Sequence, residues 1–329
     1  MSIIIGGPPS SGSSLLSVLL NRHSDIYIEQ ESHMLSKAGL YHNWNRKKKA
    51  IYSDSYTYLP SPGWHMLNGV VMSEVDEEVK SELSQTVKTS HDLKSFISSY
   101  SKHKVLHHDK KIWGEKTPSN IYFFNKIMSI LPESTFISTI RNPYDIIASL
   151  INRGLTTFSA FGLCLSQLYM TYAQQRDIAV YFVKYEDLVK EPEKSLNSLF
   201  KHLDVKVENV QINSKDEVKI KGWNYHEDGD IGTKSINRFQ KLPQRIKDDI
   251  ISLADQFIVN PRFINQFISA RDINADTLNL KYLAKHFGYE NPVALSKSKY
   301  HYQIKYSLDR AKRLFKLHPT FITYPIKRK

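Results

Sequence analysis

The stretch Ile3-Ile4-Ile5-Gly6-Gly7-Pro8-Pro9-Ser10-Ser11-Gly12-Ser13-Ser14-Leu15-Leu16 decides the fold that we expect for this chain. An apolar run, a glycine-rich turn and a stretch of helical character follow one another, which is the order strand, turn, helix. Such a turn aims backbone N–H groups and the positive end of the helix at one point, where a phosphate can bind. The spacing Gly7-x-x-x-x-Gly12 fits a phosphate loop, but Ser13 stands where a nucleotide triphosphatase carries lysine. The loop is therefore expected to hold a phosphate without gripping a transferring γ-phosphate.

Length and charge set the outer limits of the interpretation. The 329 residues suffice for one large α/β domain with insertions. The single cysteine, Cys164, excludes an intramolecular disulfide and fits a reducing compartment. We expect neither a signal peptide nor a transmembrane segment. The formal net charge is +12, and residues 295–329 carry ten Lys/Arg and one Asp. This basic tail is suited to an anionic polymer or an acidic membrane surface, or is simply a solvated segment.

Strand and helix patterns alternate along most of the chain. Strands are expected at 25–28, 135–140 and 179–183, and helices at 118–130, 144–152, 163–176 and 192–203. Trp113–Pro118 is interpreted as a loop, with Thr117 capping the helix that Pro118 begins. The alternation predicts an α/β three-layer sandwich with a central parallel sheet flanked by helices. The domain is expected to span 1–265, with a helical substrate-binding insertion at 41–110 and a basic, Tyr-rich extension at 266–329.

A second candidate anion site opens at Arg141, at the end of a predicted strand. Asp145, Ser149 and Arg153 follow at four-residue steps and so share roughly one side of the next helix. An arginine fork and a hydroxyl converging there can hold a second phosphate. The alternative is a surface ion pair between Asp145 and Arg153. Ligands of such sheets bind beyond the carboxyl ends of the strands, where both candidate sites lie.

The two candidate sites together resemble those of the sulfotransferases that use 3′-phosphoadenosine 5′-phosphosulfate (PAPS). The family pattern Arg-x-Pro-x-Asp-x-x-x-Ser stands here as Arg141-Asn142-Pro143-Tyr144-Asp145-Ile146-Ile147-Ala148-Ser149. Three further landmarks keep the expected order, namely Glu115–Pro118, Val183–Leu188 and Lys234–Phe239. The resemblance covers about residues 3–245 and is closest to the branch of tyrosylprotein and bacterial carbohydrate sulfotransferases. It implies a P-loop-like fold, PAPS as co-substrate and 3′,5′-adenosine bisphosphate (PAP) as product.

The resemblance also implies a role for individual residues. Glu31 would be the general base, and Lys116 and Ser235 would stabilise the transferring sulfuryl group and the bridging oxygen. Glu29 and His33 compete for the role of base, since Glu29 and Glu31 would point the same way in an extended segment. Cofactor binding would involve the first loop for the 5′-phosphosulfate and the second site for the 3′-phosphate: Ser10, Ser11, Gly12, Ser13, Ser14, Arg141, Ser149, Arg153, Tyr185 and Arg238.

The loop departs from the family at one position. A lysine or arginine usually precedes the Ser-Gly pair, and here that residue is Ser10. Lys116, Arg238 or Lys241 could supply the missing charge. The alternatives to a sulfotransferase are a catalytically impaired relative that binds nucleotide or anionic glycan, and a P-loop kinase, which Ser13 disfavours.

The resemblance implies a hydroxyl-bearing acceptor, which is a carbohydrate, a lipid or a peptide, and of these we expect a carbohydrate or glycolipid. Trp44, Tyr56, Trp64 and Trp223 could stack on sugar rings or serve in ordinary packing. We expect a cytoplasmic protein whose basic tail can rest on an acidic leaflet. No metal is expected, because His103, His107, His108 and Asp109 form no closed zinc pattern. No nucleic acid partner is expected either, since no binding motif accompanies the tail.

Overall fold

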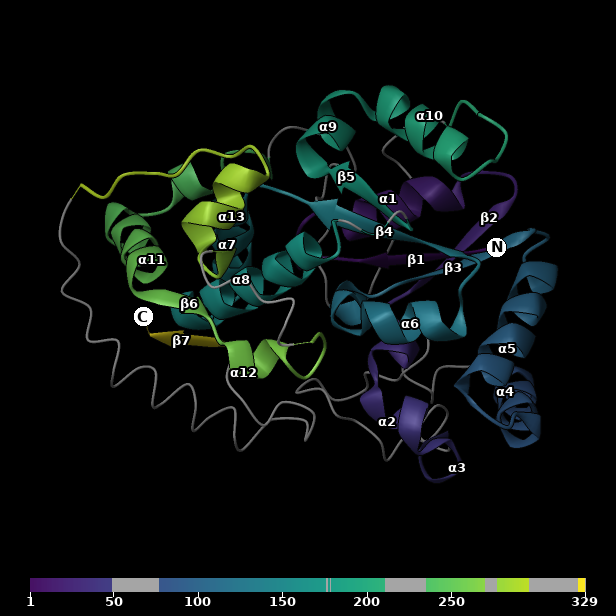
Figure 1. Cartoon of the computed structure of the whole chain (residues 1–329). Helices are drawn as coiled ribbons and strands as arrows, with labels where there is room; N and C mark the ends of the chain where they lie inside the picture. Colours follow the sequence, from purple (N-terminus) through teal and green to yellow (C-terminus); the bar gives the residue numbers. More distant parts are fainter. Residues whose placement is uncertain are drawn as a thin grey trace.

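A five-stranded parallel sheet forms the centre of the molecule (Figure 1). The computed structural model describes residues 1–48, 77–175, 177, 179–210, 235–269, 277–295 and 325–328. The strand order is β2-β3-β1-β4-β5. The strands are β1 (Ser2–Gly6), β2 (Ile26–Gln30), β3 (Ile112–Lys116), β4 (Ser134–Ile140) and β5 (Val180–Lys184). This sheet confirms the predicted α/β fold.

Helices cover both faces of the sheet. Successive side chains of a strand point to opposite faces, so Ile3 and Ile5 pack in one hydrophobic core and Ile4 in the other. The core around Ile3 contains α1 (Ser13–Asn21) and α10 (Pro192–His202), which lie with α9 (Tyr185–Lys190) above the sheet in Figure 1. Helices that contribute to the larger core include α5 (Leu93–His107), α6 (Phe124–Ile130), α7 (Pro143–Asn152) and α8 (Thr157–Ala173).

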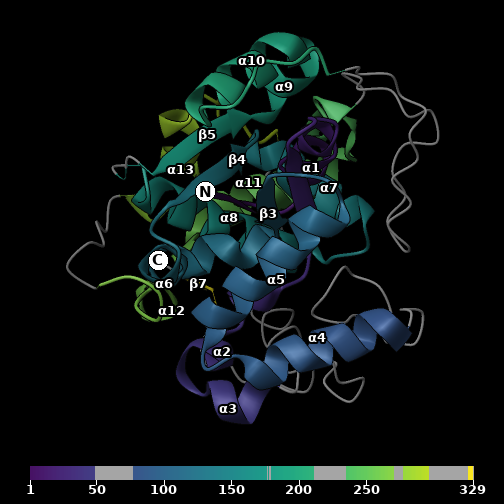
Figure 2. The same ribbon diagram turned by 90° about the vertical axis from the view of Figure 1, so that its right-hand side faces the viewer.

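The expected insertion at 41–110 contains helices wherever the structure describes it. A 3-10 turn η1 (Met34–Ser36) leads into α2 (Ala38–His42) and α3 (Trp44–Lys47), and α4 (Glu77–Thr89) precedes α5. Figure 2 shows α2, α3 and α4 together at the foot of the molecule. Trp44 is buried against Phe96 and donates its indole N–H to the Ser90 carbonyl at 2.9 Å. Its ring therefore serves in packing. The other three aromatic candidates for sugar stacking lie outside the described residues.

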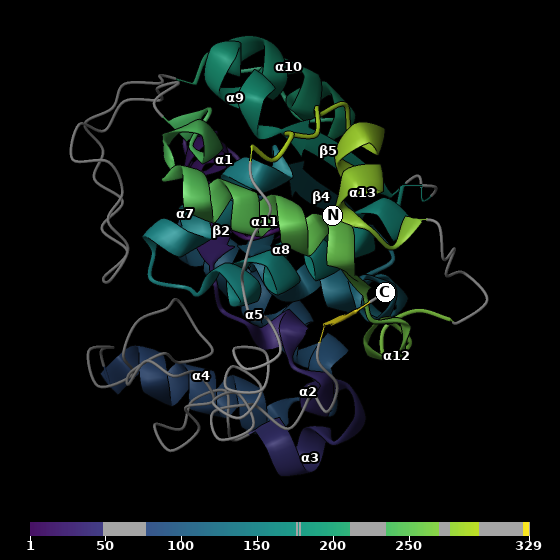
Figure 3. The ribbon, with the colours of Figure 1, turned by 90° about the vertical axis from the view of Figure 1, so that its left-hand side faces the viewer.

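The C-terminal elements that the structure describes are η6 (Phe239–Lys241), α11 (Gln244–Gln256), β6 (Phe257–Val259), α12 (Pro261–Ile264), α13 (Leu280–His286) and β7 (Ile326–Arg328). Most of them pack beside α8, namely α11, β6, α13 and β7, whereas η6 packs beside α7 (Figure 3). Strand β7 pairs antiparallel with β6, and Ile326 and Leu283 belong to the larger core. The division of the chain at residue 265 stays a prediction. No helix in the described parts of the chain has the length and apolar character needed to cross a bilayer.

The interpretation of Trp113–Pro118 as a loop is wrong, because residues 112–116 form β3, an interior strand between β2 and β1. Gly114 and the charged pair Glu115-Lys116 suggested a loop. The glycine is needed for the close approach of β1 and β2, since a Cβ atom there would lie 2.4 Å from Ile28 Cδ1 and 2.6 Å from the Ile3 carbonyl oxygen. The two charged side chains are fully buried and hydrogen-bonded.

Helix boundaries differ from the sequence pattern at two places. The helix expected at 118–130 begins as a 3-10 segment, η4 (Pro118–Phe123), before α6. Thr117 is its N-cap residue and Pro118 follows, as predicted, but the Thr117 hydroxyl makes no capping hydrogen bond and donates instead to the Glu115 carboxylate. Helix α8 begins at Thr157, six residues before the expected start, where the Thr156 hydroxyl accepts from the Ser159 backbone N–H at 3.2 Å.

Candidate active site

The glycine-rich turn connects β1 to the N-terminus of α1, as the sequence predicted. Gly12 is the N-cap residue of α1 and has a φ of 96°, which a residue with a Cβ rarely adopts. A Cβ atom on Gly12 would lie 2.5 Å from Tyr185 Cδ2, so the tyrosine ring rests directly on the turn. Ser10 also has a left-handed backbone, with a φ of 62°. The turn therefore presents the first N–H groups of α1 beside the Tyr185 ring.

The serines of the turn face in different directions. Ser11 is fully buried, and its Oγ donates to the Pro8 carbonyl and lies 2.5 Å from Thr139 Oγ1. Its hydroxyl thus fixes the turn to β4, and contact with a ligand would come through its backbone N–H. Ser13 is also buried, whereas Ser14 Oγ accepts a hydrogen bond from Lys116 Nζ at 2.9 Å.

Arg141 links the second candidate site to the first. Its Nη1 donates to the Ser10 carbonyl at 2.9 Å, and its guanidinium carbon lies 4.5 Å from the centroid of the Tyr185 ring. Its Nη2 donates to the Ser235 carbonyl, while its Nε is buried and has no hydrogen-bond partner among the residues that the structure describes. A guanidinium from the end of β4 and a helix N-terminus from the end of β1 therefore lie within the span of one nucleotide.

Residues 235–239 form a turn that packs against α7 and contacts Asp145 and Ser149 of that helix. Arg238 Nη1 donates to Ser149 Oγ at 2.8 Å, and its Nη2 donates to Ser235 Oγ at 2.7 Å. The Asp145 carboxylate accepts from the backbone N–H groups of Asn237, at 2.8 Å, and Phe239, at 2.9 Å. Asp145 is buried and thus anchors the turn that carries Arg238, which differs from the surface ion pair considered from the sequence.

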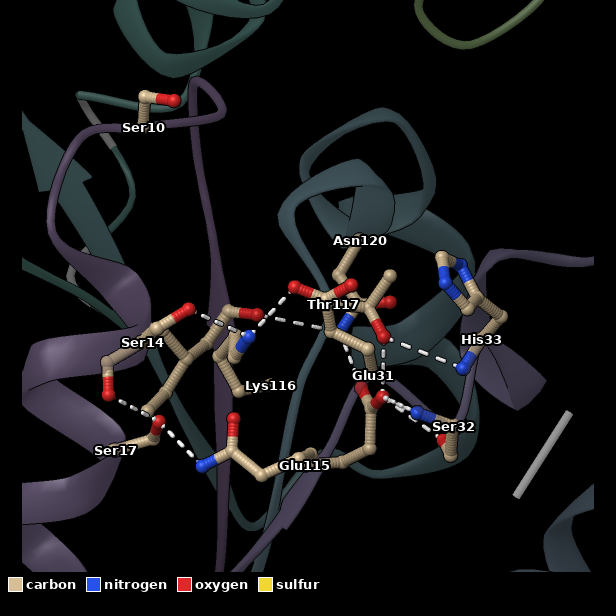
Figure 4. Close-up of polar contacts among 12 residues, drawn as sticks. Ser10, Ser14, Ser17, Glu31, Ser32, His33, Glu115, Lys116, Thr117 and Asn120 are labelled. Atoms are coloured by element: carbon tan, nitrogen blue, oxygen red, sulfur yellow. Dashed lines mark hydrogen bonds and ion pairs between the residues drawn. The ribbon is translucent and has the colours of Figure 1, made fainter. Parts of the chain in front are cut away.

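Glu31 and Lys116 form a buried ion pair beside the turn (Figure 4). Lys116 Nζ lies 2.7 Å from Glu31 Oε1 and donates as well to Ser14 Oγ, so it stands between the carboxylate and α1. Burial by itself would raise the pKa of Glu31, but the positive charge of Lys116, its hydrogen bond and the positive charge of Arg153 lower it below its usual value. Glu31 is therefore ionised at neutral pH.

The three candidates for a base have different surroundings. Strand β2 ends at Gln30, and Glu31 has a left-handed φ of 41°, so Glu29 and Glu31 do not point the same way as an extended segment would require. Glu29 is buried and accepts from the Tyr100 hydroxyl at 3.0 Å, and burial raises its pKa. Burial lowers the pKa of His33 to about 4, which leaves its ring neutral. Of the two glutamates, Glu31 contacts the lysine beside the turn.

A fully buried carboxylate, that of Glu115, holds this arrangement together (Figure 4). It accepts from the Ser32 backbone N–H at 3.1 Å, the Ser32 hydroxyl at 2.8 Å, the Thr117 hydroxyl, and Asn120 Nδ2 at 2.5 Å. Burial raises the pKa of Glu115, and these hydrogen bonds oppose that effect. The end of β2 and the end of β3 are thus fixed to each other.

The sequence pattern gave no role to several residues that shape the site. Asp145 was quoted within the Arg-x-Pro-x-Asp motif, and its place in the first turn of a helix after Arg141 could have indicated an anchoring carboxylate. Thr139 and Asn120 have no signal in a single sequence, because their contacts join segments far apart in the chain. Arg153 was assigned to the second site, but its Nη1 donates to Ser10 Oγ of the first turn at 3.0 Å.

Comparison with known proteins agrees with this geometry. A parallel α/β sheet with a phosphate-type turn after β1 and an arginine after β4 has its candidate ligand-binding groups beyond the carboxyl ends of the strands, where ligands of such sheets bind. The family model described as "Sulfotransferase family" matches residues 2–209, so the chain belongs to the sulfotransferase family. No curated protein matches the sequence significantly.

Two solved structures have the same fold. The sulfotransferase domain from the olefin synthase of Synechococcus PCC 7002 is 19% identical at a TM-score of 0.50; the alignment covers 89% of this chain and 95% of that domain. The sulfotransferase domain from the curacin biosynthetic pathway is 18% identical at a TM-score of 0.53, with 88% and 98% covered. At these identities the likeness concerns the fold.

Proposed function

We propose that this sulfotransferase transfers a sulfuryl group from PAPS to a hydroxyl acceptor. One observation carries the proposal: Arg141 Nη1 lies 2.9 Å from the carbonyl of Ser10 in the phosphate-type turn. Two anion-binding groups, each at the end of a parallel strand, are therefore adjacent, as a donor with phosphates on both its 5′ and 3′ positions requires. A nucleoside triphosphate has its phosphates in one chain and would not need the second site.

The two ends of the donor would be bound by different parts of the site. The N–H groups at the start of α1, with Ser14, would hold the 5′-phosphosulfate. Arg141, Ser149 and Arg238 would hold the 3′-phosphate, and the buried Nε of Arg141 has a hydrogen to donate. Tyr185, which already rests on Gly12, would lie against the nucleotide. Ser235 contacts Arg238 through its hydroxyl, so it would act next to the 3′-phosphate as well as near the sulfuryl group.

The chemistry would use the Glu31–Lys116 pair. Glu31 would take the proton of the acceptor hydroxyl as the acceptor oxygen bonds to sulfur. The bond from sulfur to the bridging oxygen would break, and its electron pair would stay on the 5′-phosphate of PAP. Lys116 would stabilise the charge that develops there, a contribution of about 2.7–4 kcal/mol for a positioned donor. Lys116 contacts both Glu31 and Ser14. Its ammonium group could therefore move from the carboxylate of Glu31 to the sulfuryl group during the reaction.

Thermal unfolding with added ligand tests the donor. PAP should raise the unfolding temperature in the absence of metal, whereas ATP with magnesium should not. The opposite result would favour a P-loop kinase, and no shift with either ligand would favour a binding protein that does not use nucleotide. Either of those two results would overturn the proposal.

Glutamine variants of the two glutamates test the base. Glu31→Gln should keep the binding of PAP and lose transfer of label from radiolabelled PAPS, by on the order of 100-fold or more. Glu29→Gln is the matched control and should keep both, because Glu29 contacts the Tyr100 hydroxyl rather than the lysine beside the turn. Equal activity of Glu31→Gln and the unchanged protein would remove Glu31 as the base.

The acceptor class rests on the family resemblance alone. A carbohydrate or glycolipid hydroxyl stays our prediction, as do the cytoplasmic location and the contact of the basic tail with an acidic membrane surface. Residues 296–324 of that tail lie outside the described residues. Radiolabelled PAPS offered with sugars, lipids and peptides in parallel would identify the class, and label on peptides alone would refute our choice.

A further inference from the structure

The phosphate-type turn contains no cationic side chain of its own, since Gly6–Ser14 reads GGPPSSGSS. Helix dipoles and backbone N–H groups alone hold a doubly charged phosphosulfate less firmly than they do with a guanidinium or ammonium group beside them. A positive charge at the tip of the turn must therefore come from another segment.

Arg153 lies at that tip. Its Nη1 donates to Ser10 Oγ at 3.0 Å, whereas Arg141 reaches the carbonyl of the same residue. Arg153 is also one of the charges that lower the pKa of Glu31, which places its guanidinium within electrostatic reach of the expected base. Arg141 also contacts the carbonyl of Ser235, and Arg238 contacts the hydroxyl of Ser149. Both of these contacts lie on the side expected to hold the 3′-phosphate.

The backbone at Arg153 is fixed even though its side chain is exposed. Arg153 is the C-cap residue of α7, and Gly154 follows with a left-handed φ of 87°. The Gly154 N–H donates to the Ile151 carbonyl at 2.9 Å, and the Leu155 N–H donates to the Leu150 carbonyl at 3.1 Å, which is a Schellman motif. Because the backbone is fixed and the guanidinium group is exposed, the side chain of Arg153 can turn from the Ser10 hydroxyl to an anionic oxygen. Hydrogen bonds from the guanidinium group to an anion are stronger than those to a hydroxyl.

We propose that Arg153 binds the 5′-phosphosulfate end of the donor and supplies the charge that Ser10 does not carry. This inference rests on the proposed function and moves Arg153 from the second site to the first. During transfer the guanidinium would face the bridging oxygen, which gains negative charge as its bond to sulfur breaks. The carboxylate of Glu31 and the guanidinium of Arg153 would then flank the reacting sulfur.

Binding measurements with three nucleotides separate the two ends of the site. Isothermal titration calorimetry would compare PAP, adenosine 5′-phosphate and adenosine 3′-phosphate. Arg153→Ala should weaken the binding of PAP and of adenosine 5′-phosphate by the same factor, about tenfold or more. It should leave the affinity for adenosine 3′-phosphate unchanged. Arg153→Lys should lie in between, because it keeps the charge and loses the fork. Arg238→Ala should show the reverse pattern, and Arg245→Ala, an exposed arginine of α11, should change nothing.

The outcomes distinguish this inference from the proposed function. If the unchanged protein binds PAP but Arg153→Ala weakens only the 3′-phosphate, or none of the three nucleotides, Arg153 does not serve the 5′ end. If the unchanged protein binds none of them, the proposed function fails and this inference fails with it. Unfolding temperatures of the variants, measured alongside, should match that of the unchanged protein, since Arg153 is exposed.

Discussion

Replacing Lys116 by methionine should destabilise the protein strongly at neutral pH. The lysine is fully buried, and its ammonium group lies 2.7 Å from Glu31 Oε1, whose side chain is only 10% exposed. Lys116→Met would leave that carboxylate buried without its counter-charge, which costs about 3–5 kcal/mol when one partner of a buried pair is removed. Whole domains are stable by only about 5–15 kcal/mol, so the loss would be a large fraction of the total.

The pH dependence follows from the same pair. The folded-state pKa of Glu31 is lowered, so the pair stabilises the protein fully above the ordinary glutamate pKa of about 4.3 and loses this effect as pH falls through the folded value. In Lys116→Met, burial would instead raise the pKa of Glu31. The deficit relative to the unchanged protein should therefore be largest near neutral pH and shrink towards about pH 4.

Urea unfolding of three variants measures the effect. The double variant Glu31→Gln with Lys116→Met removes both charges and should be more stable than Lys116→Met alone by at least about 1 kcal/mol. Glu31→Gln alone leaves the fully buried ammonium group of Lys116 without its counter-charge, so it should also be less stable than the double variant. The reasoning would be refuted if Lys116→Met unfolded at the same urea concentration as the unchanged protein, or if the double variant were the least stable of the three.

Three further substitutions test other parts of the site and sheet. Asp145→Asn should weaken the binding of PAP about tenfold, because one of the two backbone hydrogen bonds to the carboxylate is lost, and should leave the affinity for adenosine 5′-phosphate unchanged. Equal losses for both nucleotides in calorimetry would contradict the role of Asp145 as the anchor of the turn that carries Arg238. Gly12→Ala should lower the unfolding temperature and weaken PAP, since its left-handed backbone costs about 1–2 kcal/mol and its Cβ would lie 2.5 Å from the Tyr185 ring; unchanged values would show that the ring can move away. Gly114→Ala should destabilise by about 1–3 kcal/mol or more through the contacts of 2.4 and 2.6 Å in the sheet, whereas Gly39→Ala, whose Cβ would meet only a flexible lysine at 3.4 Å, should not; equal unfolding curves would contradict the packing argument.

The parts of the fold with strong local patterns were predictable. Strand β1 is an isoleucine run and α1 begins directly after Gly12, so both boundaries could be placed within one or two residues. Strand β3 could not, because its glycine and its two charged residues are typical of a loop. Only the tertiary structure provides the close neighbours that require Gly114 and the partners that neutralise Glu115 and Lys116.

The sequence identified candidate site residues, whose roles stay predictions, but it did not indicate most of the contacts among them. The motif around Arg141 and the turn at Ser10 could each be recognised, and they do meet. The inward direction of the Ser11 hydroxyl, the different environments of Glu29 and Glu31, and the reach of Arg153 depend on backbone angles and on segments distant in sequence. Spacing along a single element does not determine such geometry.

The buried Glu115 carboxylate has a consequence for how this enzyme could change its acceptor. Its hydrogen bonds join the exits of β2 and β3, so Glu31 and Lys116 keep their separation whatever follows Ser32 in the chain. Under the proposed function, changes in the segment after Ser32 could alter the surroundings of an incoming hydroxyl while the proposed reacting groups stay in place. With such a scaffold, the residues that recognise the acceptor could be replaced, in evolution or by design, without moving Glu31 and Lys116.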